Sequence, residues 1–265
     1  MKRKQLFQLA AAVIAVAIIS LLTACKDNND AQQSSETPIE EKILGNWITT
    51  KYGDSPAITE EKVVVKFVSP TKCLFNMLMA DYEEEGGWVD DLPFDVTIKD
   101  NVVTLSGKIN EHISAVYELT ITKIDDKYME CMMKTTDIMD GETYTDEYFT
   151  SFDRLTTDYK KDLVGTWETL EQEDNTRWRY EFKENGTFSV SFLDDEGEWV
   201  ILYSDYAEYS CDCSLLTMRW LYIGESPTND AWEISYIRDG TMQWTALRMD
   251  DEGNMYTELV QLKKI

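Results

Sequence analysis

Acidic side chains are the most numerous groups in this sequence that could carry out chemistry. The chain has 50 Asp and Glu residues against 25 Lys and Arg residues. Two carboxyl groups at the right separation can hydrolyse a glycoside, one as acid and the other as base or nucleophile. Here the acidic clusters are contiguous and lie near glycines, which is typical of solvated hairpin tips. We expect no catalytic residues, with a carboxylate-dependent hydrolase as the alternative. The clusters lie at 83–85, 90–91, 194–196 and 250–252.

Metal and cofactor sites find little support in the sequence. Carboxylate oxygens can bind calcium, but no acidic cluster has the spaced ligands of an EF-hand loop. His112 is the single histidine, and no serine- or cysteine-centred motif accompanies it. A zinc site would have to combine His112 with thiols in the other half of the chain. No glycine-rich phosphate loop is present, and we expect neither a metal nor a cofactor.

Four of the five cysteines lie beyond the N-terminal segment, and the sequence leaves their redox state open. Cys73 and Cys131 fall in the first half of the chain, Cys211 and Cys213 in the second. Export from the cytoplasm would permit disulfides. Cys211 and Cys213 are two residues apart on one face of an expected strand, which is poor geometry for a bond between them. Disulfides and free buried thiols both fit the sequence.

The elements that must position these residues come in two copies. Leu-Gly-Asn-Trp at 44–47 recurs as Val-Gly-Thr-Trp at 164–167, and five further matches follow in the same order. The offset drifts between about 120 and 110 residues, as insertions in loops would cause. We therefore expect two tandem domains, at 38–156 and 157–265.

Within each copy the apolar residues alternate with polar ones, as Phe188, Val190 and Phe192 do. This period of two predicts half-buried strands, and Gly, Asn and Asp mark the turns between them. Because the links are too short for parallel crossovers, each copy should be an antiparallel up-and-down barrel of eight strands. In the second copy we expect strands near 163–171, 176–183, 186–193, 198–211 (open to a break), 215–223, 231–237, 241–249 and 254–263.

The N-terminal residues predict export and lipid attachment. Residues 2–4 are basic and 6–22 are mostly apolar, which is typical of a signal peptide, with an uncleaved membrane anchor as the alternative. The apolar core ends in Leu22, Thr23, Ala24 and Cys25, a run that resembles the lipobox of bacterial lipoproteins. The resemblance implies that 1–24 is a lipoprotein signal peptide, that Cys25 is acylated, and that 25–37 is a flexible tether.

Acyl chains on Cys25 would anchor the protein in a membrane, because each methylene buried among the lipids contributes about 0.8 kcal/mol to membrane binding. A membrane is therefore the first expected partner. Lys26 followed by acidic residues resembles the surface-export signal of Bacteroidota lipoproteins. We expect an outer-membrane protein exposed at the cell surface, with a periplasm-facing one as the alternative. The net charge of −25 excludes nucleic acid as a partner, because like charges repel.

The Gly-x-Trp motif at the expected first strand of each copy resembles the lipocalin family, and more closely the small lipocalin-like domains of Bacteroidota lipoproteins. The resemblance covers nearly the whole chain after the tether. It implies that a basic residue near the last strand closes each barrel by stacking over the first-strand tryptophan, as a cation over an indole face does. Arg154 would serve Trp47, and Lys264 or its neighbour Lys263 would serve Trp167. We expect Gly45 and Gly165 to be structural with these tryptophans.

Trp88 and Trp199 are the candidates for ligand binding. Each follows a glycine and an acidic turn at an equivalent place in its copy. At a barrel mouth such a ring could contact a small hydrophobic or glycan ligand, and the alternative is a ring that caps the core. Two functions follow: a lipid-anchored binding protein with a ligand in its barrels, or a surface interaction protein with filled barrels and a protein partner. They differ in whether the inward side chains fill each barrel.

Overall fold

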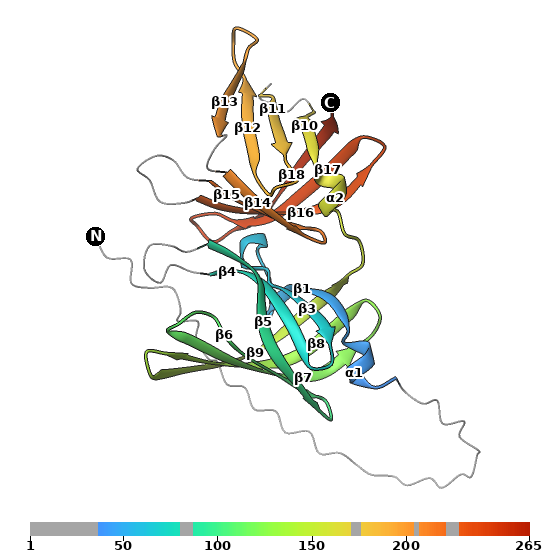
Figure 1. The fold of residues 1–265 in the computed structure, drawn as a ribbon, viewed down its shortest axis with the longest axis vertical. Helices are drawn as coiled ribbons and strands as arrows, with labels where there is room; N and C mark the ends of the chain where they lie inside the picture. The colour runs from blue at the N-terminus through green and yellow to red at the C-terminus, as the bar shows by residue number, and fades with distance from the viewer. Residues whose placement is uncertain (1–36, 80–86, 171–175, 204–206, 221–227) are drawn as a thin grey trace, which may run out of the picture. The chain divides into compact units, whose positions relative to one another are not determined.

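The computed structural model describes residues 37–79, 87–170, 176–203, 207–220 and 228–265. The lipobox, Cys25 and the expected tether up to residue 36 lie outside these residues, as does the acidic cluster at 83–85. Residues 37–265 form one compact unit, which is built almost wholly from antiparallel strands in two nine-stranded sheets (Figure 1). The predicted all-β antiparallel fold is confirmed.

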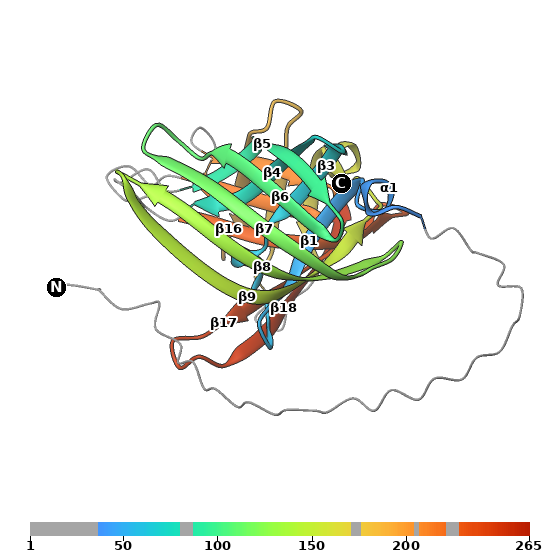
Figure 2. The same ribbon diagram turned by 90° about the horizontal axis from the view of Figure 1, so that it is seen from below.

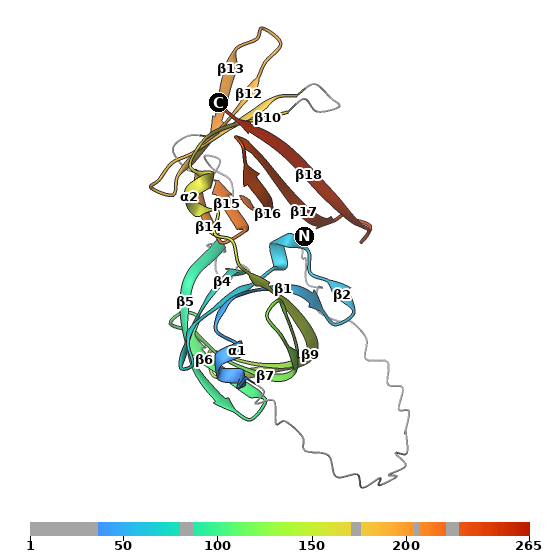
Figure 3. The ribbon, with the colours of Figure 1, turned by 90° about the vertical axis from the view of Figure 1, so that its right-hand side faces the viewer.

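The first sheet closes into a barrel. Each strand pairs with its neighbour in the chain, except that the two-residue β2 adds only to β1, and β9 returns to pair with β1. Trp47 lies opposite Arg154 in that closing ladder. Figure 3 shows the resulting closed ring, and Figure 2 shows the strands of this sheet lying side by side. Its strands are β1 (Gly45–Tyr52), β2 (Ser55–Pro56), β3 (Val64–Ser69), β4 (Lys72–Met79), β5 (Gly87–Lys99), β6 (Val102–Lys108), β7 (Ile113–Ile124), β8 (Tyr128–Met139) and β9 (Glu142–Leu155).

The second sheet repeats this order but stays open. Its first strand β10 pairs with β11 and with the last strand, β18. The segment expected as one strand at 198–211 is divided into two strands. The first of them, β13, pairs with β12, and the second, β14, pairs with β15. Its strands are β10 (Gly165–Thr169), β11 (Trp178–Phe182), β12 (Phe188–Leu193), β13 (Trp199–Tyr203), β14 (Ala207–Asp212), β15 (Leu215–Trp220), β16 (Thr228–Arg238), β17 (Thr241–Met249) and β18 (Met255–Lys264).

The divided strand corrects the expectation of a second closed barrel. No ladder joins β13 to β14 in the described part of the chain. A single bridge between Thr187 and Glu208 brings the two ends of the sheet together, supported by the N–H of Tyr209, which donates to the carbonyl of Gly186 at 2.8 Å. In the first barrel the equivalent β5 is a continuous strand that pairs with β4 and β6, and this continuity lets the barrel close.

Short helices precede the first strand of each copy. They are α1 (Ile39–Lys42) and α2 (Lys160–Leu163), and a 3₁₀ turn, η1 (Thr59–Glu61), lies between β2 and β3. Ile43 and Leu163, at the ends of these helices, are completely buried beneath the sheets. No described helix has the length and apolarity needed to cross a membrane.

Large side chains occupy the inward positions of both sheets. Trp47, Phe94 and Phe152 are buried to within 2% in the first, and the Phe75 and Phe94 rings lie 4.7 Å apart. In the second, Trp167 and Trp244 are similarly buried, and Trp244 stacks on Trp232 with ring centroids 5.5 Å apart. The alternation read from the sequence therefore places aromatic rings, which bury the most apolar area per residue, in the core.

The two sheets also contact one another. Ile48 and Val64 of the first pack against Leu215 and Ala231 of the second. Around this apolar centre lie ion pairs. Lys62 binds Glu233 at 2.6 Å, while Arg248 binds Glu60 of η1 together with Asp230 at 2.6 Å and Glu258 at 3.1 Å. Burial raises the pKa of Asp230 to about 6. Replacing one of these charged side chains by a neutral one would leave the charge of its partner uncompensated in a poorly solvated site.

Cys73, Cys131, Cys211 and Cys213 are free and buried. Burial raises the pKa of the Cys73 and Cys131 thiols to about 12. A thiol reacts as its thiolate, so these side chains should be inert in the folded protein.

We therefore predict that a Cys25→Ser variant in native buffer at pH 8 reacts with a thiol-specific chromophore at least on the order of 1000-fold more slowly than a free cysteine. Because the pKa values are raised, labelling should stay slow as the pH increases until the fold opens. In denaturant without reductant, all four thiols should react at once. Fewer than four would reveal a disulfide and contradict the structure.

Candidate functional site

The glycine, tryptophan and cation of the first copy form one interlocked group at the base of the barrel. The Trp47 indole donates to the carbonyl of Ile43 at 2.7 Å, and the Arg154 guanidinium lies 4.1 Å from the indole ring centroid. The same guanidinium donates to the carbonyls of Leu44 and Lys42. Gly45 has φ +114°, and a Cβ there would lie 2.7 Å from Arg154 Nη1. Only glycine fits both the backbone and the cation.

The second copy repeats this arrangement. The Trp167 indole donates to the carbonyl of Leu163 at 2.7 Å, and Lys264 Nζ lies 5.1 Å from the ring centroid. Lys264 also donates to the carbonyl of Val164 at 2.9 Å. Gly165 has φ +132°, and a Cβ there would lie 2.7 Å from Lys264 Cε. Each group joins the first strand to the last and leaves no indole face open to a ligand.

Trp88 lies where the two sheets meet. Its half-buried ring packs on the cluster of Ile48, Val64, Leu215 and Ala231, so two sheets contribute to its surroundings. The sequence suggested a barrel mouth for this residue. The difference arises because the local pattern around Trp88 carries no information about the second sheet that covers it.

Trp199 has different surroundings from Trp88. It lies on the outward side of β13, where the Arg179 guanidinium is 3.8 Å and the Arg177 guanidinium 5.7 Å from its ring centroid. Both guanidinium groups bind the carboxylate of Glu168, Arg179 at 3.0 Å, and Lys263 lies 3.7 Å from it. We call these five residues the second outer face.

Sequence reasoning missed three members of the second outer face. Glu168 follows Trp167 directly and therefore points outward from a strand whose tryptophan points inward, yet its side chain is only 4% exposed. Arg177 and Arg179 flank Trp178 and so share one side of their strand. The sequence shows this spacing of two residues, and it could have indicated that both arginines lie on one face of the sheet.

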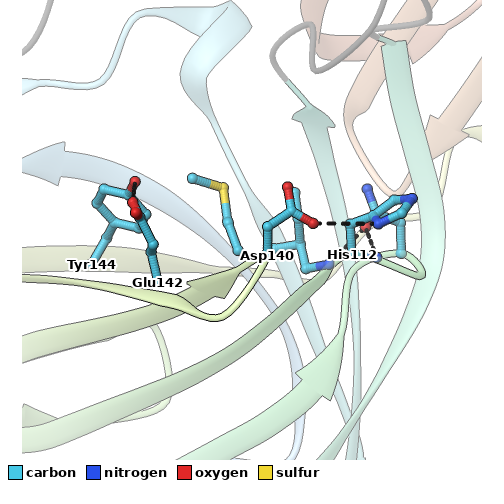
Figure 4. Close-up of a pocket in the computed structure, with 7 residues that line it drawn as sticks. His112, Asp140, Glu142 and Tyr144 are labelled. Atoms are coloured by element: carbon cyan, nitrogen blue, oxygen red, sulfur yellow. Dashed lines mark hydrogen bonds and ion pairs between the residues drawn. The ribbon is translucent and has the colours of Figure 1, made fainter.

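A shallow cleft lies at one end of the first barrel, between the β6–β7 link and the β8–β9 turn. It encloses about 440 Å³ (Figure 4). His112 Nδ1 lies 3.4 Å from an Asp140 carboxylate oxygen, and the Tyr144 hydroxyl donates to Glu142 at 2.7 Å. The His112 and Asp140 side chains are 71% and 82% exposed, so their attraction is weak. The cleft is lined by Asn110, His112, Ile113, Met139, Asp140, Glu142 and Tyr144.

Two of the acidic clusters in the described residues serve turns, whereas the one at 90–91, expected at a hairpin tip, lies inside β5 beside an irregularity in its pairing with β4. Asp194 accepts the N–H of Glu198 at 2.7 Å, and Asp250 accepts the N–H of Asn254 at 2.8 Å. The hydrogen bond from the Asn254 backbone is the main cause that lowers the pKa of Asp250. Asp91 has φ +56° and binds Lys66 at 2.6 Å. Within the described ranges, no three His, Cys, Asp or Glu side chains are grouped so that they could hold a metal ion.

Comparison with known proteins adds two distant likenesses. No protein-family model and no curated protein matches the chain. A crystal structure from Nitrosomonas europaea, provisionally described as AttH, aligns at 10% identity and a TM-score of 0.25, over 88% of this chain and 98% of that one. A double mutant of the vaccine antigen transferrin-binding protein B from Haemophilus parasuis aligns at 10% identity and a TM-score of 0.22, over 83% of this chain and 59% of that one. Such TM-scores show no shared fold, so the fold rests on the strand pairing.

The base groups lead to a prediction about stability. Arg154→Ala should lower the free energy of unfolding by about 2 kcal/mol, because the cation over the indole and two hydrogen bonds to carbonyls are lost. Lys264→Ala should cost less than 1 kcal/mol, since the lysine is exposed. Urea unfolding followed by tryptophan fluorescence measures both. Arg238→Ala, which removes only an exposed cation 4.6 Å from the Tyr236 ring, is the control and should change stability by under about 0.5 kcal/mol. Equal losses in all three variants would refute a closing role.

Proposed function

We propose that this chain is a lipid-anchored outer-membrane protein, exposed at the cell surface, that acts through the outer surface of its two β-domains by binding a protein partner. The packed interior of both sheets is the observation that carries this proposal. Between the alternatives of a ligand-filled barrel and a filled one, the buried aromatic side chains favour the second.

The physical argument is one of volume. A ligand-carrying barrel needs small side chains at inward positions, so that space remains between the strands. Here the inward positions carry Trp47, Phe94 and Phe152 in the first sheet, and Trp167 and Trp244 in the second. Opening a ligand site would expose these rings, and burying one such side chain contributes about 1.5–3 kcal/mol. A small ligand would have to replace several of these contacts.

The anchor rests on the lipobox resemblance at Leu22–Cys25. Acylation there would leave a tether of about a dozen residues, which as a flexible coil spans roughly 20 Å. That reach would hold the β-domains close to the membrane while leaving their outward faces free to meet a partner.

Native mass spectrometry of the full chain, released gently from its own cells, tests the proposed mode of action. We expect one species whose mass is that of the processed chain plus its acyl groups, in every preparation. We expect this because aromatic side chains occupy inward positions of the described strands, where a small apolar or glycan molecule would otherwise bind. A constant additional mass of a few hundred daltons that persists until the protein unfolds would contradict this proposal and support the alternative of a bound ligand.

The anchor has its own test. Cys25→Ser should move the protein from the membrane fraction to the soluble fraction, because the acylated thiol is gone and the remaining chain carries a strongly negative charge. Cell fractionation with and without high salt measures this. Lys26→Ser, next to the modified residue, is the matched control and should stay with the membrane. Membrane association of the Cys25→Ser protein would instead favour an uncleaved N-terminal helix.

A further inference from the structure

The strand register allows the two copies to be compared residue by residue. In each copy the second residue after the base tryptophan is a threonine whose hydroxyl accepts a backbone N–H from the segment that faces it across the sheet. Thr49 accepts from Val63 at 2.8 Å, and Thr169 accepts from Trp178 at 2.9 Å. These matched hydrogen bonds fix the equivalence of β1 and β3 with β10 and β11.

The outward positions on these strands are therefore equivalent too. Ile48 of the first copy pairs with Val64, while Glu168 of the second pairs with Arg179 and, on its other side, with Lys263. Directly paired residues share one face of a sheet. An apolar pair in the first copy is thus replaced by charged residues in the second.

Trp88 and Trp199 also occupy equivalent positions in the two copies. Following the ladders one strand further makes Leu78 and Leu193 equivalent. Leu78 pairs with Trp88, and Leu193 pairs with Trp199. The same outward face of each copy therefore carries a tryptophan at the same place.

The first copy uses this face to hold another domain. Ile48 and Val64 are 2% and 0% exposed, because they pack with Trp88 against Leu215 and Ala231 of the second sheet. At the edge of the contact, Lys62 binds the carboxylate of Glu233 at 2.6 Å. The surface that fits this face is an apolar centre with a carboxylate beside it.

The second copy leaves its equivalent face exposed to solvent. The side chains of Arg177, Arg179 and Lys263 are 37%, 30% and 48% exposed. In the described part of the chain, all three cations lie within ion-pairing distance of the Glu168 carboxylate, in a protein of net charge −25. Ile201, in the same row of the ladder as Arg179, is 64% exposed.

We propose that the second outer face, with Ile201, is the docking surface for another protein that presents carboxylates beside an apolar centre. The inference rests on the proposed function and names the surface and partner chemistry that it requires. Arginine and tryptophan side chains contribute most to the binding energy of protein interfaces. A guanidinium also binds a carboxylate in a bidentate geometry that lysine does not match.

A second copy of this chain fits less well. Its surface of the required kind, around Leu215 and Ala231, is already covered by its own first barrel. Two chains of charge −25 also repel one another. The partner is therefore a different protein.

Photo-crosslinking in living cells tests this surface in the full-length protein. Ile201→p-benzoylphenylalanine places the probe on the docking face, and Val68→p-benzoylphenylalanine, at a side chain 59% exposed, is the matched control. We expect illumination to give a heterologous adduct from position 201 and not from position 68. The crosslinked partner peptide, identified by mass spectrometry, should combine acidic and apolar residues.

A double variant then tests whether formation of the adduct depends on the positively charged side chains. Arg177→Gln with Lys263→Gln keeps the pair between Arg179 and Glu168, so the fold should survive, which circular dichroism checks. The adduct yield should fall about ten-fold, as expected for loss of an interface hot spot. An unchanged yield, or an adduct with the mass of two copies of this chain, would overturn the proposal.

The remaining outcomes separate this inference from the proposed function. Adducts from position 68 with none from position 201 would leave a surface-acting protein but refute this surface. No adduct from either position, together with a ligand in the native mass spectrum, would refute both.

Discussion

The closing contact of each copy is a cation held over an indole ring, and it lies where the first strand meets the last. Every other pairing in the meander joins strands that are close in the chain and form cheaply as hairpins. The first and last strands are far apart in the chain, so their pairing carries the largest loop-closure entropy, although this grows only slowly with length. Trp47 and Arg154 lie opposite one another in that pairing, as do Trp167 and Lys264. Both base groups also bind the short helix before the first strand, and thereby seal the end of the core.

The same closing device produces a closed barrel in one copy and an open sheet in the other, so the difference lies elsewhere. In the first copy β5 runs without a break from its contact with β4 to its contact with β6. Its leading end carries Trp88, which is packed between the sheets and thus held in place. In the second copy the equivalent segment divides into β13 and β14, and two arginine side chains lie over Trp199. Packing from a neighbouring domain therefore accompanies closure of the first barrel.

The sequence predicted what depends on local pattern and missed what depends on contacts between domains. The period of two and the short links predicted the antiparallel sheets. The strands expected in the second copy lie close to the observed ones, apart from the division of the strand expected at 198–211. Trp88 and Trp199 have similar local sequences, and the register places them at equivalent positions. Their environments differ because the second sheet covers one and not the other, which no window of neighbouring residues can reveal. Glu168 was missed for a related reason, since an acidic residue on an outward position is normally solvated.

The contrast between the two outward faces also bears on what each face does. A face that packs against another domain is apolar, as Ile48 and Val64 are, and an uncovered face of that kind would promote aggregation. Solubility alone would be met by acidic side chains, which this chain uses almost everywhere else. The second domain instead carries Arg177 and Arg179 beside Trp199, with Glu168 buried beneath them. Burying a carboxylate has a desolvation cost that solubility does not require, whereas holding two guanidinium groups in fixed positions beside an aromatic ring is what recognition requires. The composition of this face therefore agrees with the docking surface proposed above better than with a face that only keeps the protein soluble.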